Sequence, residues 1–424
     1  MDKKELIIGI DFTQEYSKVC YFSEKHAGCE NVIAPGSGLG LLIPSVLSYD
    51  SENERWLLGG QAKEHALKTG SFIYNDLLTK ALSNESYEIN GQIFSGTDLF
   101  AVFLKGLINL ARSSSGIYPV FCVNIAMRRI NSDIKEMIEQ VLSKTGIERE
   151  RIHLLNYPES FAYFILQQDE ELWREGARLF DFSKDGFFVN HLTWTRLKDH
   201  QAIYVNESNY SMEFSYKDVE NVVLRPGLDD RLNELYEEIK GEEVKTSVYF
   251  TGSGFEELWF SKTLENISSE RRAFRGNNIY AKGACLLGLL RKEDVLDQVS
   301  VICRPKTKAS ISVEARKKGV PSQIVLSPAA VNWYEASGSA DFILDDARMI
   351  EFKITSLMSR QEAYIPFNLS IFPLRPSKTT RVRVSARYIN EYECEICVKD
   401  LGFGELYSVG SKEVRKILDL EGYI

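Results

Sequence analysis

The chain has 424 residues, of which 44% are hydrophobic and 26% are charged. This length favours two or three domains, and this composition excludes a disordered chain, a collagen and a small disulfide-rich protein. The formal net charge of −9 argues against nucleic acid or an anionic membrane as a partner, because phosphates would be repelled. The seven scattered cysteines are typical of a reducing compartment, and no signal peptide or membrane-spanning stretch is evident. We therefore expect a cytoplasmic protein.

Strands and helices alternate in the first part of the chain. Apolar runs at 6–10 and 18–22 predict a hairpin whose first strand ends at Asp11. The elements predicted next are a helix at 98–112, a strand at 118–125, a helix at 131–145, a strand at 152–155 and a helix at 159–168. This order predicts an α/β fold in which helices cover a sheet.

The pattern then starts again. Strands at 178–182 and 187–192 predict a second hairpin around Asp181, so both halves open with a strand that ends in aspartate. This repetition indicates an internal duplication. The elements predicted after it are a helix at 227–240, a strand at 248–250, a helix from Phe255 onward and a helix at 279–290.

The last part of the chain has a different character. Apolar and polar residues alternate in short runs after residue 300, which predicts a β-sandwich. We therefore expect a first domain at 1–293, a linker at 294–305 and a β-sandwich at 306–424.

Asp11 and Asp181 are the first candidate site residues. Two carboxylates at strand ends that face one cleft can act as catalytic residues and as ligands of a hydrated Mg²⁺. The turns after them would present backbone N–H groups to phosphates, and a glycine-containing turn can let a nucleotide approach the backbone. The candidate cofactor-binding residues are Thr13, Gln14, Ser183, Lys184, Gly252, Ser253 and Gly254. The alternative is that each aspartate is an ordinary turn residue.

Several short motifs, taken in order, resemble those of the heat-shock-70 chaperones. The motifs of the first domain are Ile8-Gly9-Ile10-Asp11, Ile43-Pro44-Ser45-Val46, Leu58-Gly59-Gly60-Gln61-Ala62-Lys63, Asn156-Tyr157-Pro158-Glu159, Leu179-Phe180-Asp181-Phe182, Thr251-Gly252-Ser253-Gly254 and Tyr280-Ala281-Lys282-Gly283-Ala284. In the last domain, Phe367-Asn368-Leu369 and the segment 394–404 resemble motifs of the family's peptide-binding domain. The resemblance implies an actin-like ATPase fold made of duplicated ribonuclease-H-like lobes, followed by a β-sandwich. It also implies ATP or ADP with Mg²⁺ as cofactor and a peptide or protein as partner of the sandwich.

The sequence departs from this family at the residues that would contact phosphate. Glu15 adds negative charge beside the first turn, and Ser183-Lys184-Asp185 replaces a glycine run. The family's catalytic lysine falls near Asn75-Asp76 and is missing, and the region from Leu197 to Lys245, expected to be helical, is short. No helical lid is expected after the sandwich.

We interpret the chain as a diverged relative of these chaperones, similar to poorly characterised bacterial proteins, with weak or lost ATP binding and hydrolysis. The alternative is a pseudo-ATPase scaffold in a bacterial protein complex. A sugar kinase on the same fold is a third hypothesis, which the sandwich and the short second lobe disfavour.

Other motifs favour structural roles. Cys394 and Cys397 lie three residues apart on one predicted strand, so they face opposite sides and do not chelate one metal. The basic clusters Arg128-Arg129 and Arg271-Arg272 with Arg275 are interpreted as solvated faces, with an adenosine contact from Arg271, Arg272 or Arg275 as the alternative.

Overall fold

The computed structural model divides the chain into two compact units, Met1–Cys303 and Arg304–Ile424. The described residues are 4–35, 40–83, 85–197, 200–241, 246–276, 278–345, 348–357, 359–410 and 412–423. The boundary falls inside the expected linker, but part of that linker, Val299–Cys303 (β16), is a strand in a sheet of unit 1. Over the described ranges, no helix has the length and apolarity needed to cross a membrane.

The first sheet of unit 1 is mixed and contains both parallel and antiparallel strand pairs. Its main strands are β1 (Leu6–Phe12), β2 (Tyr16–Ser23), β3 (Gly28–Asn31), β9 (Val120–Met127) and β10 (Ile152–Asn156). They lie in the order β10-β9-β1-β2-β3, and the short β4 (Ile43–Pro44) pairs with β2. β1 is antiparallel to β2 and parallel to β9. The carboxyl end of β1 therefore lies beside that of β9.

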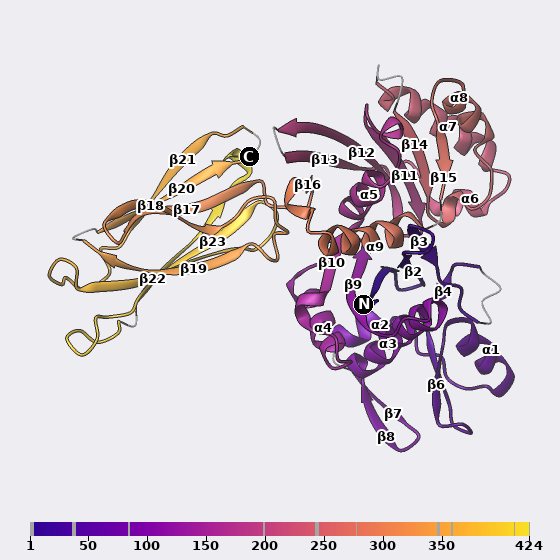
Figure 1. Cartoon of the computed structure of the whole chain (residues 1–424), viewed down its shortest axis with the longest axis horizontal. Coiled ribbons are helices and arrows are strands. Elements are labelled where there is room, and N and C mark those ends of the chain that lie inside the picture. Colours follow the sequence, from indigo (N-terminus) through magenta and orange to yellow (C-terminus); the bar gives the residue numbers. More distant parts are fainter. Residues whose placement is uncertain are drawn as a thin grey trace. The chain divides into compact units, whose positions relative to one another are not determined.

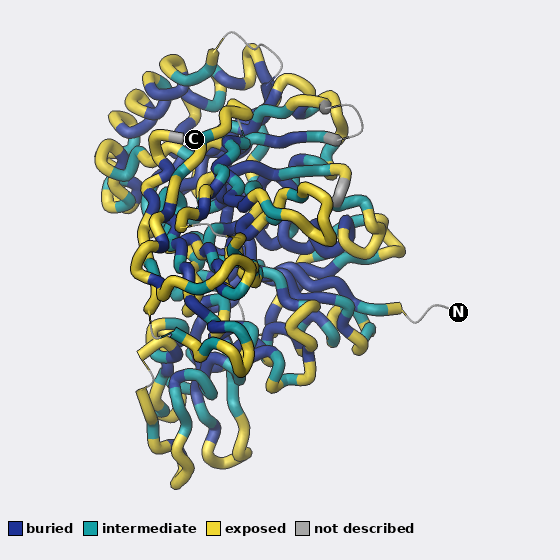
Figure 2. The backbone as a smooth tube through the Cα atoms, turned by 90° about the vertical axis from the view of Figure 1, so that its left-hand side faces the viewer, coloured by how far each residue is buried: buried dark blue, intermediate teal, exposed yellow. Residues whose placement is uncertain are grey.

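The second sheet repeats this arrangement. Its strands are β11 (Ala177–Ser183), β12 (Gly186–Leu197), β13 (His200–Asn209), β14 (Ser247–Thr251), β15 (Ala273–Arg275) and β16. The order is β15-β14-β11-β12-β13-β16, with β11 antiparallel to β12 and parallel to β14. The expectation of a helical region directly after Leu197 was wrong, because 200–209 is a strand that pairs along β12. Figure 2 shows the central strands of this unit mainly as buried backbone.

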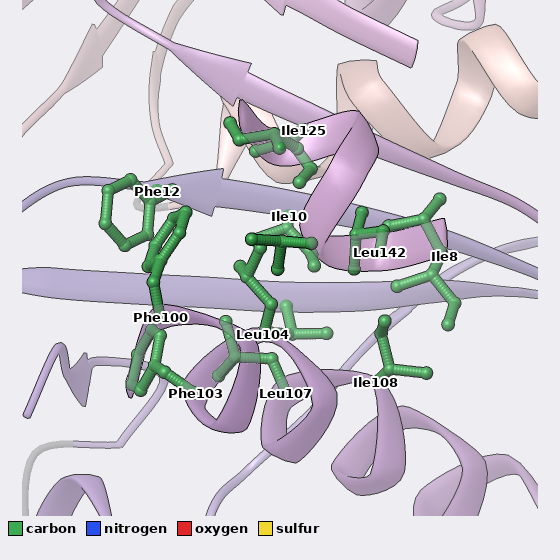
Figure 3. Packing of buried hydrophobic residues seen from close by; sticks show 14 of the residues in the cluster. Ile8, Ile10, Phe12, Phe100, Phe103, Leu104, Leu107, Ile108, Ile125 and Leu142 are labelled. Carbon is green, nitrogen blue, oxygen red and sulfur yellow. The ribbon is translucent and has the colours of Figure 1, made fainter. Parts of the chain in front are cut away.

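Helices α3 (Gly96–Ser115) and α4 (Ser132–Ser143) belong to the first half. Ser95 and Asp98 form a capping box that starts α3, and Gly116, in the left-handed region with φ of 72°, ends it. Figure 3 shows the apolar face of α3, including Leu104, directed towards Ile10 on β1. This packing holds the strand that carries Asp11.

Helices α5 (Tyr157–Leu166) and α9 (Ile279–Lys292) lie in the middle of unit 1 (Figure 1). α9, from the second half, packs on β1, β2 and β9 of the first sheet, whereas α5, from the first half, packs on β13 and β16 of the second. The two helices also contact each other, and a Cβ added at Gly283 would lie 1.8 Å from the Ser160 carbonyl oxygen. Each half thus supplies the helix that covers the sheet of the other.

The remaining elements of unit 1 are peripheral. In chain order they are β5 (Leu47–Asp50), β6 (Arg55–Leu58), α1 (Gly59–Thr69), α2 (Leu77–Ser83), β7 (Ser86–Ile89), β8 (Gln92–Ser95), α6 (Tyr216–Glu220), α7 (Arg225–Ile239) and α8 (Ser261–Glu270). Residues from α7 and α8 share an aromatic-rich core with β11 and β14, in which Phe180 stacks on Phe250. The helix expected from Phe255 begins only at Ser261, after a 3₁₀ turn at Ser253–Phe255.

Unit 2 is built from two four-stranded antiparallel sheets. One has the order β18 (Val320–Ser327), β17 (Ala309–Lys317), β20 (Met349–Ser356) and β21 (Glu362–Asn368). The other has the order β19 (Ser337–Leu344), β22 (Thr380–Tyr388), β23 (Glu393–Asp400) and β24 (Glu413–Asp419). Alternate residues of both, such as Phe352 and Val384, are buried in one core. On β23, Cys394 is buried and Cys397 only partly, as their three-residue spacing predicts.

His153, on β10, gives unit 1 a pH-dependent stability. Burial lowers the pKa of His153 from 6.5 to about 4, and the charges of Arg291 and Lys135 act in the same direction. In the unfolded chain the His153 imidazole binds a proton below about pH 6.5, whereas in the folded protein it stays neutral down to about pH 4. The free energy of unfolding therefore decreases as the pH falls from 6.5 towards 4. Linkage predicts a loss of about 2 kcal/mol by pH 5. Urea unfolding of the wild type and His153→Gln at pH 7 and 5 measures this, and an identical pH dependence in both proteins would contradict it.

Candidate functional site

Unit 1 contains a cavity of about 480 Å³ at the carboxyl ends of β1 and β11. This volume lies within the range of small-molecule sites. Asp11 and Asp181 both line it, and each side chain is almost fully buried. The two halves thus bring their corresponding aspartates to one place, as the repeated topology requires.

Asp11 is held by two neighbours. The Tyr157 hydroxyl donates a hydrogen bond to its Oδ1 at 2.7 Å, and the Lys18 ammonium lies 3.4 Å from its Oδ2. Burial raises the pKa of Asp11, Lys18 and Tyr157 partly offset this, and the negative charge of Asp181 raises the pKa further. Burial therefore makes the charged form of Asp11 costly, and the Lys18 ammonium and the Tyr157 hydroxyl stabilise that form.

Asp181 is held in a corresponding way, with a guanidinium in addition. The Tyr280 hydroxyl donates to its Oδ2 at 2.8 Å, and Arg128 forms an ion pair with the same oxygen. Arg128 also donates to Glu207 Oε2 at 3.1 Å. Burial alone would lower the pKa of Arg128, but the charge of Asp181 and its other neighbours raise it, so the guanidinium stays charged.

Aromatic rings surround this guanidinium. Its central carbon lies 3.9 Å from the Phe188 ring centroid and 4.6 Å from that of Tyr157. The rings of Tyr157 and Tyr280 are stacked, with centroids 3.8 Å apart and planes within 8° of parallel. Each hydroxyl group of this stacked pair donates to one of the two aspartates, Tyr157 to Asp11 and Tyr280 to Asp181. Arg128 is thus enclosed by carboxylates and π-faces, an environment that stabilises a buried cation.

The turns that follow the two aspartate strands meet at the cavity. Lys184, between β11 and β12, forms an ion pair with Glu15, between β1 and β2, at 2.8 Å. Both side chains are about half exposed, so this pair contributes little to stability. Lys184, which the sequence predicts to bind a cofactor phosphate, is therefore already paired with a carboxylate.

The predicted cofactor-binding residues mostly lie here. Those that line the cavity are Thr13, Gln14, Ser183, Lys184, Gly252 and Ser253. Gly254 is not among the lining residues and packs against Phe182, because its turn continues into the 3₁₀ segment.

Several of these side chains hold the turns together. The Thr13 hydroxyl donates to the Tyr16 carbonyl, and the Gln14 amide donates to the Thr79 hydroxyl at 2.8 Å. Ser183 accepts a hydrogen bond from the Asp185 backbone N–H.

These residues do not fit a magnesium nucleotide. Mg²⁺ binds one or two carboxylates and otherwise retains water and phosphate oxygens. Here both aspartates already bind a tyrosine hydroxyl and a protein cation. A metal ion bound to Asp181 would have to displace the Arg128 guanidinium or lie close to it and be repelled by its positive charge. In the described part of the chain, neither aspartate belongs to a three-residue group with the ligand spacing of a metal site.

Sequence reasoning missed several site residues. The interpretation of Arg128 as part of a solvated face was wrong, since its side chain is only 13% exposed, whereas Arg129 is exposed. Arg271 is also buried, where it donates to the Tyr236 hydroxyl and to the carbonyls of residues 240 and 241. Tyr280 and Glu207 were not proposed. The signal for Tyr280 was its position near the start of α9, which corresponds to that of Tyr157 in α5.

Comparison with protein families adds two matches. A family model described as family of unknown function (DUF5716) C-terminal matches residues 38–304, more than half of the chain. The chain belongs to the DUF5716 family. A second model, domain of unknown function (DUF8552), matches residues 306–420. A search of curated proteins gives no match.

The DUF5716 match ends one residue beyond unit 1 and includes Arg128, Tyr157, Asp181 and Tyr280. It begins after β3, so Asp11 precedes it. The DUF8552 match lies within unit 2. Both descriptions leave the activity open, so the function must be argued from the site.

Proposed function

We propose that unit 1 is a diverged actin-like domain, related to that of the heat-shock-70 chaperones, which has lost magnesium-dependent ATP hydrolysis. In this proposal the chain is a pseudo-ATPase that binds a protein partner. The repeated strand order of the two sheets, with an aspartate on the first strand of each, supports the actin-like assignment. The assignment rests on topology and motif order, and fold alone does not establish function.

The observation that carries the proposal is the position of Arg128. Its guanidinium binds Asp181 and Glu207 and lies against the rings of Tyr157 and Phe188. The positive charge of Arg128 neutralises these carboxylates, as a bound metal cation would otherwise do. We infer that the arginine replaces the metal and keeps the two halves together without nucleotide.

Unit 2 is proposed to bind the partner as a β-sandwich. Its two sheets share one apolar core, which supports the sandwich assignment. Several large apolar side chains on its strands are nevertheless about half exposed or more, and in this proposal they are available to contact the partner. These residues are Val320, Val325, Ile343, Met349 and Tyr364.

Weak nucleotide binding without hydrolysis is the second candidate. The cavity favours it, because about 480 Å³ is adequate for a small ligand and glycine at 252 leaves the backbone accessible. In this case the chain would resemble the chaperones more closely, and its unit 2 would bind peptides of many proteins.

We expect millimolar ATP, with or without Mg²⁺, to leave the melting temperature of the full chain within about 1 °C of its value without ligand. A ligand at about 100 times its dissociation constant would stabilise the fold by about 2.7 kcal/mol, which is a shift of about 4 °C for a unit of this size. Calorimetry and assays for ADP give the measurement.

A large shift with ATP alone would favour the second candidate, and magnesium-dependent ADP formation would contradict the pseudo-ATPase. Affinity purification tests the partner. One stable partner, retained with and without ATP, supports the scaffold, whereas many unfolded clients contradict it.

A further inference from the structure

Three cysteine thiols meet on the other side of the first sheet from α3, beneath α9. They are Cys20 on β2, Cys29 on β3 and Cys285 on α9. Their three sulfur atoms all lie within 4.8 Å of one another. Cys20 and Cys285 are buried, while Cys29 is partly exposed. No other group of three such ligand side chains is this close in the described ranges.

The strand register places two of these thiols together. Phe22 on β2 is paired with Cys29 on β3, so Cys20, two residues before Phe22, lies on the same face as Cys29. Residues in this diagonal relation are close enough for side chains to interact. The first two ligands thus follow from the hairpin itself.

Close packing of α9 supplies the third thiol. Gly9 on β1 is paired with Cys20, and α9 lies directly on this glycine. A Cβ at Gly9 would lie 2.1 Å from the Ala281 carbonyl oxygen and 2.7 Å from the Cys285 Cβ. The absence of a side chain at Gly9 therefore allows Cys285 to reach the thiols of β2 and β3.

We propose that Cys20, Cys29 and Cys285 bind a thiophilic divalent metal ion such as Zn²⁺, with a fourth position open on the side of Cys29. Zinc–sulfur bonds of about 2.3 Å place thiolates of a tetrahedral site about 3.8 Å apart. The observed separation limit of 4.8 Å is close to this value, so small side-chain rotations close the site. This site is separate from the aspartate cavity and does not depend on the proposed function.

The surroundings of the three thiols act on their pKa values in both directions. The thiol groups of Cys20 and Cys285 lower the pKa of Cys29 by hydrogen bonding, burial opposes this, and Lys282 lowers it further. Burial raises the pKa of Cys20 and of Cys285.

In the protonated state, the Cys20 thiol donates to the Ala281 carbonyl at 3.0 Å and the Cys285 thiol to the Ile7 carbonyl at 3.7 Å. Metal binding exchanges these weak contacts for metal–sulfur bonds. The positive charge of Lys282 lies near these thiols and favours their thiolate form.

The test is a titration of the reduced, metal-free full chain with Zn²⁺ and Cd²⁺ under anaerobic conditions. We expect one ion per chain, a thiolate-to-cadmium charge-transfer absorption, and release of protons as the ion binds, because thiolates and not thiols ligate it. Cys29→Ser should lower the affinity at least about 100-fold, because loss of a ligand costs more than loss of its outer-shell partner.

Cys122→Ser is the matched control. Cys122 lies in the same apolar cluster and contacts Asn124, but it is not one of the three clustered thiols, so affinity should stay within about threefold. If Cys29→Ser does not fold, the cadmium–thiolate absorption and the proton release of the wild type are sufficient to test whether the three thiols bind the ion. Absence of a stoichiometric cadmium–thiolate signal, or equal loss in Cys122→Ser, would overturn the proposal.

Discussion

Replacing Arg128 with alanine should lower the free energy of unfolding by about 3–5 kcal/mol. The substitution leaves Asp181, whose side chain is only 3% exposed, and the nearby Glu207 without their cation. A buried carboxylate without a partner is costly because the protein interior solvates charge poorly. The ring contacts with Tyr157 and Phe188 are lost as well. Urea unfolding at neutral pH provides the measurement.

Arg129→Ala is the matched control, since Arg129 is the next residue, lines the same cavity and is exposed. Its effect should stay within about 0.5 kcal/mol. Adding Asp181→Asn to Arg128→Ala should recover part of the loss, because it removes the buried negative charge that Arg128 neutralised. A loss below about 1 kcal/mol for Arg128→Ala would mean that the arginine does not hold the site together.

Replacing Gly283 with alanine should cost about 3 kcal/mol or more. The new Cβ would lie 1.8 Å from the carbonyl oxygen and 2.6 Å from the hydroxyl oxygen of Ser160. The closer atom belongs to the backbone of α5, so a side-chain rotation cannot relieve the contact and the two helices must move apart. The Ser160 hydroxyl, which donates to the Tyr280 carbonyl at 2.6 Å, would lose its partner.

Gly227→Ala provides the comparison in a second helix. Gly227 lies in α7 with no atom within 4 Å of an added Cβ, so alanine should stabilise the protein by about 0.5–1 kcal/mol. Urea unfolding of both variants is sufficient. If Gly283→Ala were as stable as the wild type, α5 and α9 would not be packed as closely as described.

The sequence allowed good predictions where local pattern determines structure. Strands such as 6–10 and 178–182 were found because apolar runs end in polar turns, and α3 because its apolar face repeats at helical spacing. The position of both aspartates at one cavity followed from the repeated strand–aspartate pattern. The strand at 200–209 was missed because its apolar run, Ala202–Val205, is only four residues long and polar residues occupy both ends of the strand.

Side chains whose role depends on distant elements could not be predicted in this way. Nothing local distinguishes Arg128 from its exposed neighbour Arg129, since the carboxylates of Asp181 and Glu207 come from the other half. The clustered cysteines have the same property, because more than 250 residues separate Cys29 from Cys285. Whether the resemblance to the chaperones extends to their activity stays a prediction.

The exchange of α5 and α9 between the halves has a consequence for how unit 1 can be divided. Cutting the chain between α5 and β11 would leave each fragment with an apolar sheet face exposed and a helix lacking its sheet. Neither fragment should be soluble alone, but co-expressed fragments should reassemble, which would make the pair a split-protein reporter. The same reciprocity is what two identical copies of one half would form around a twofold axis.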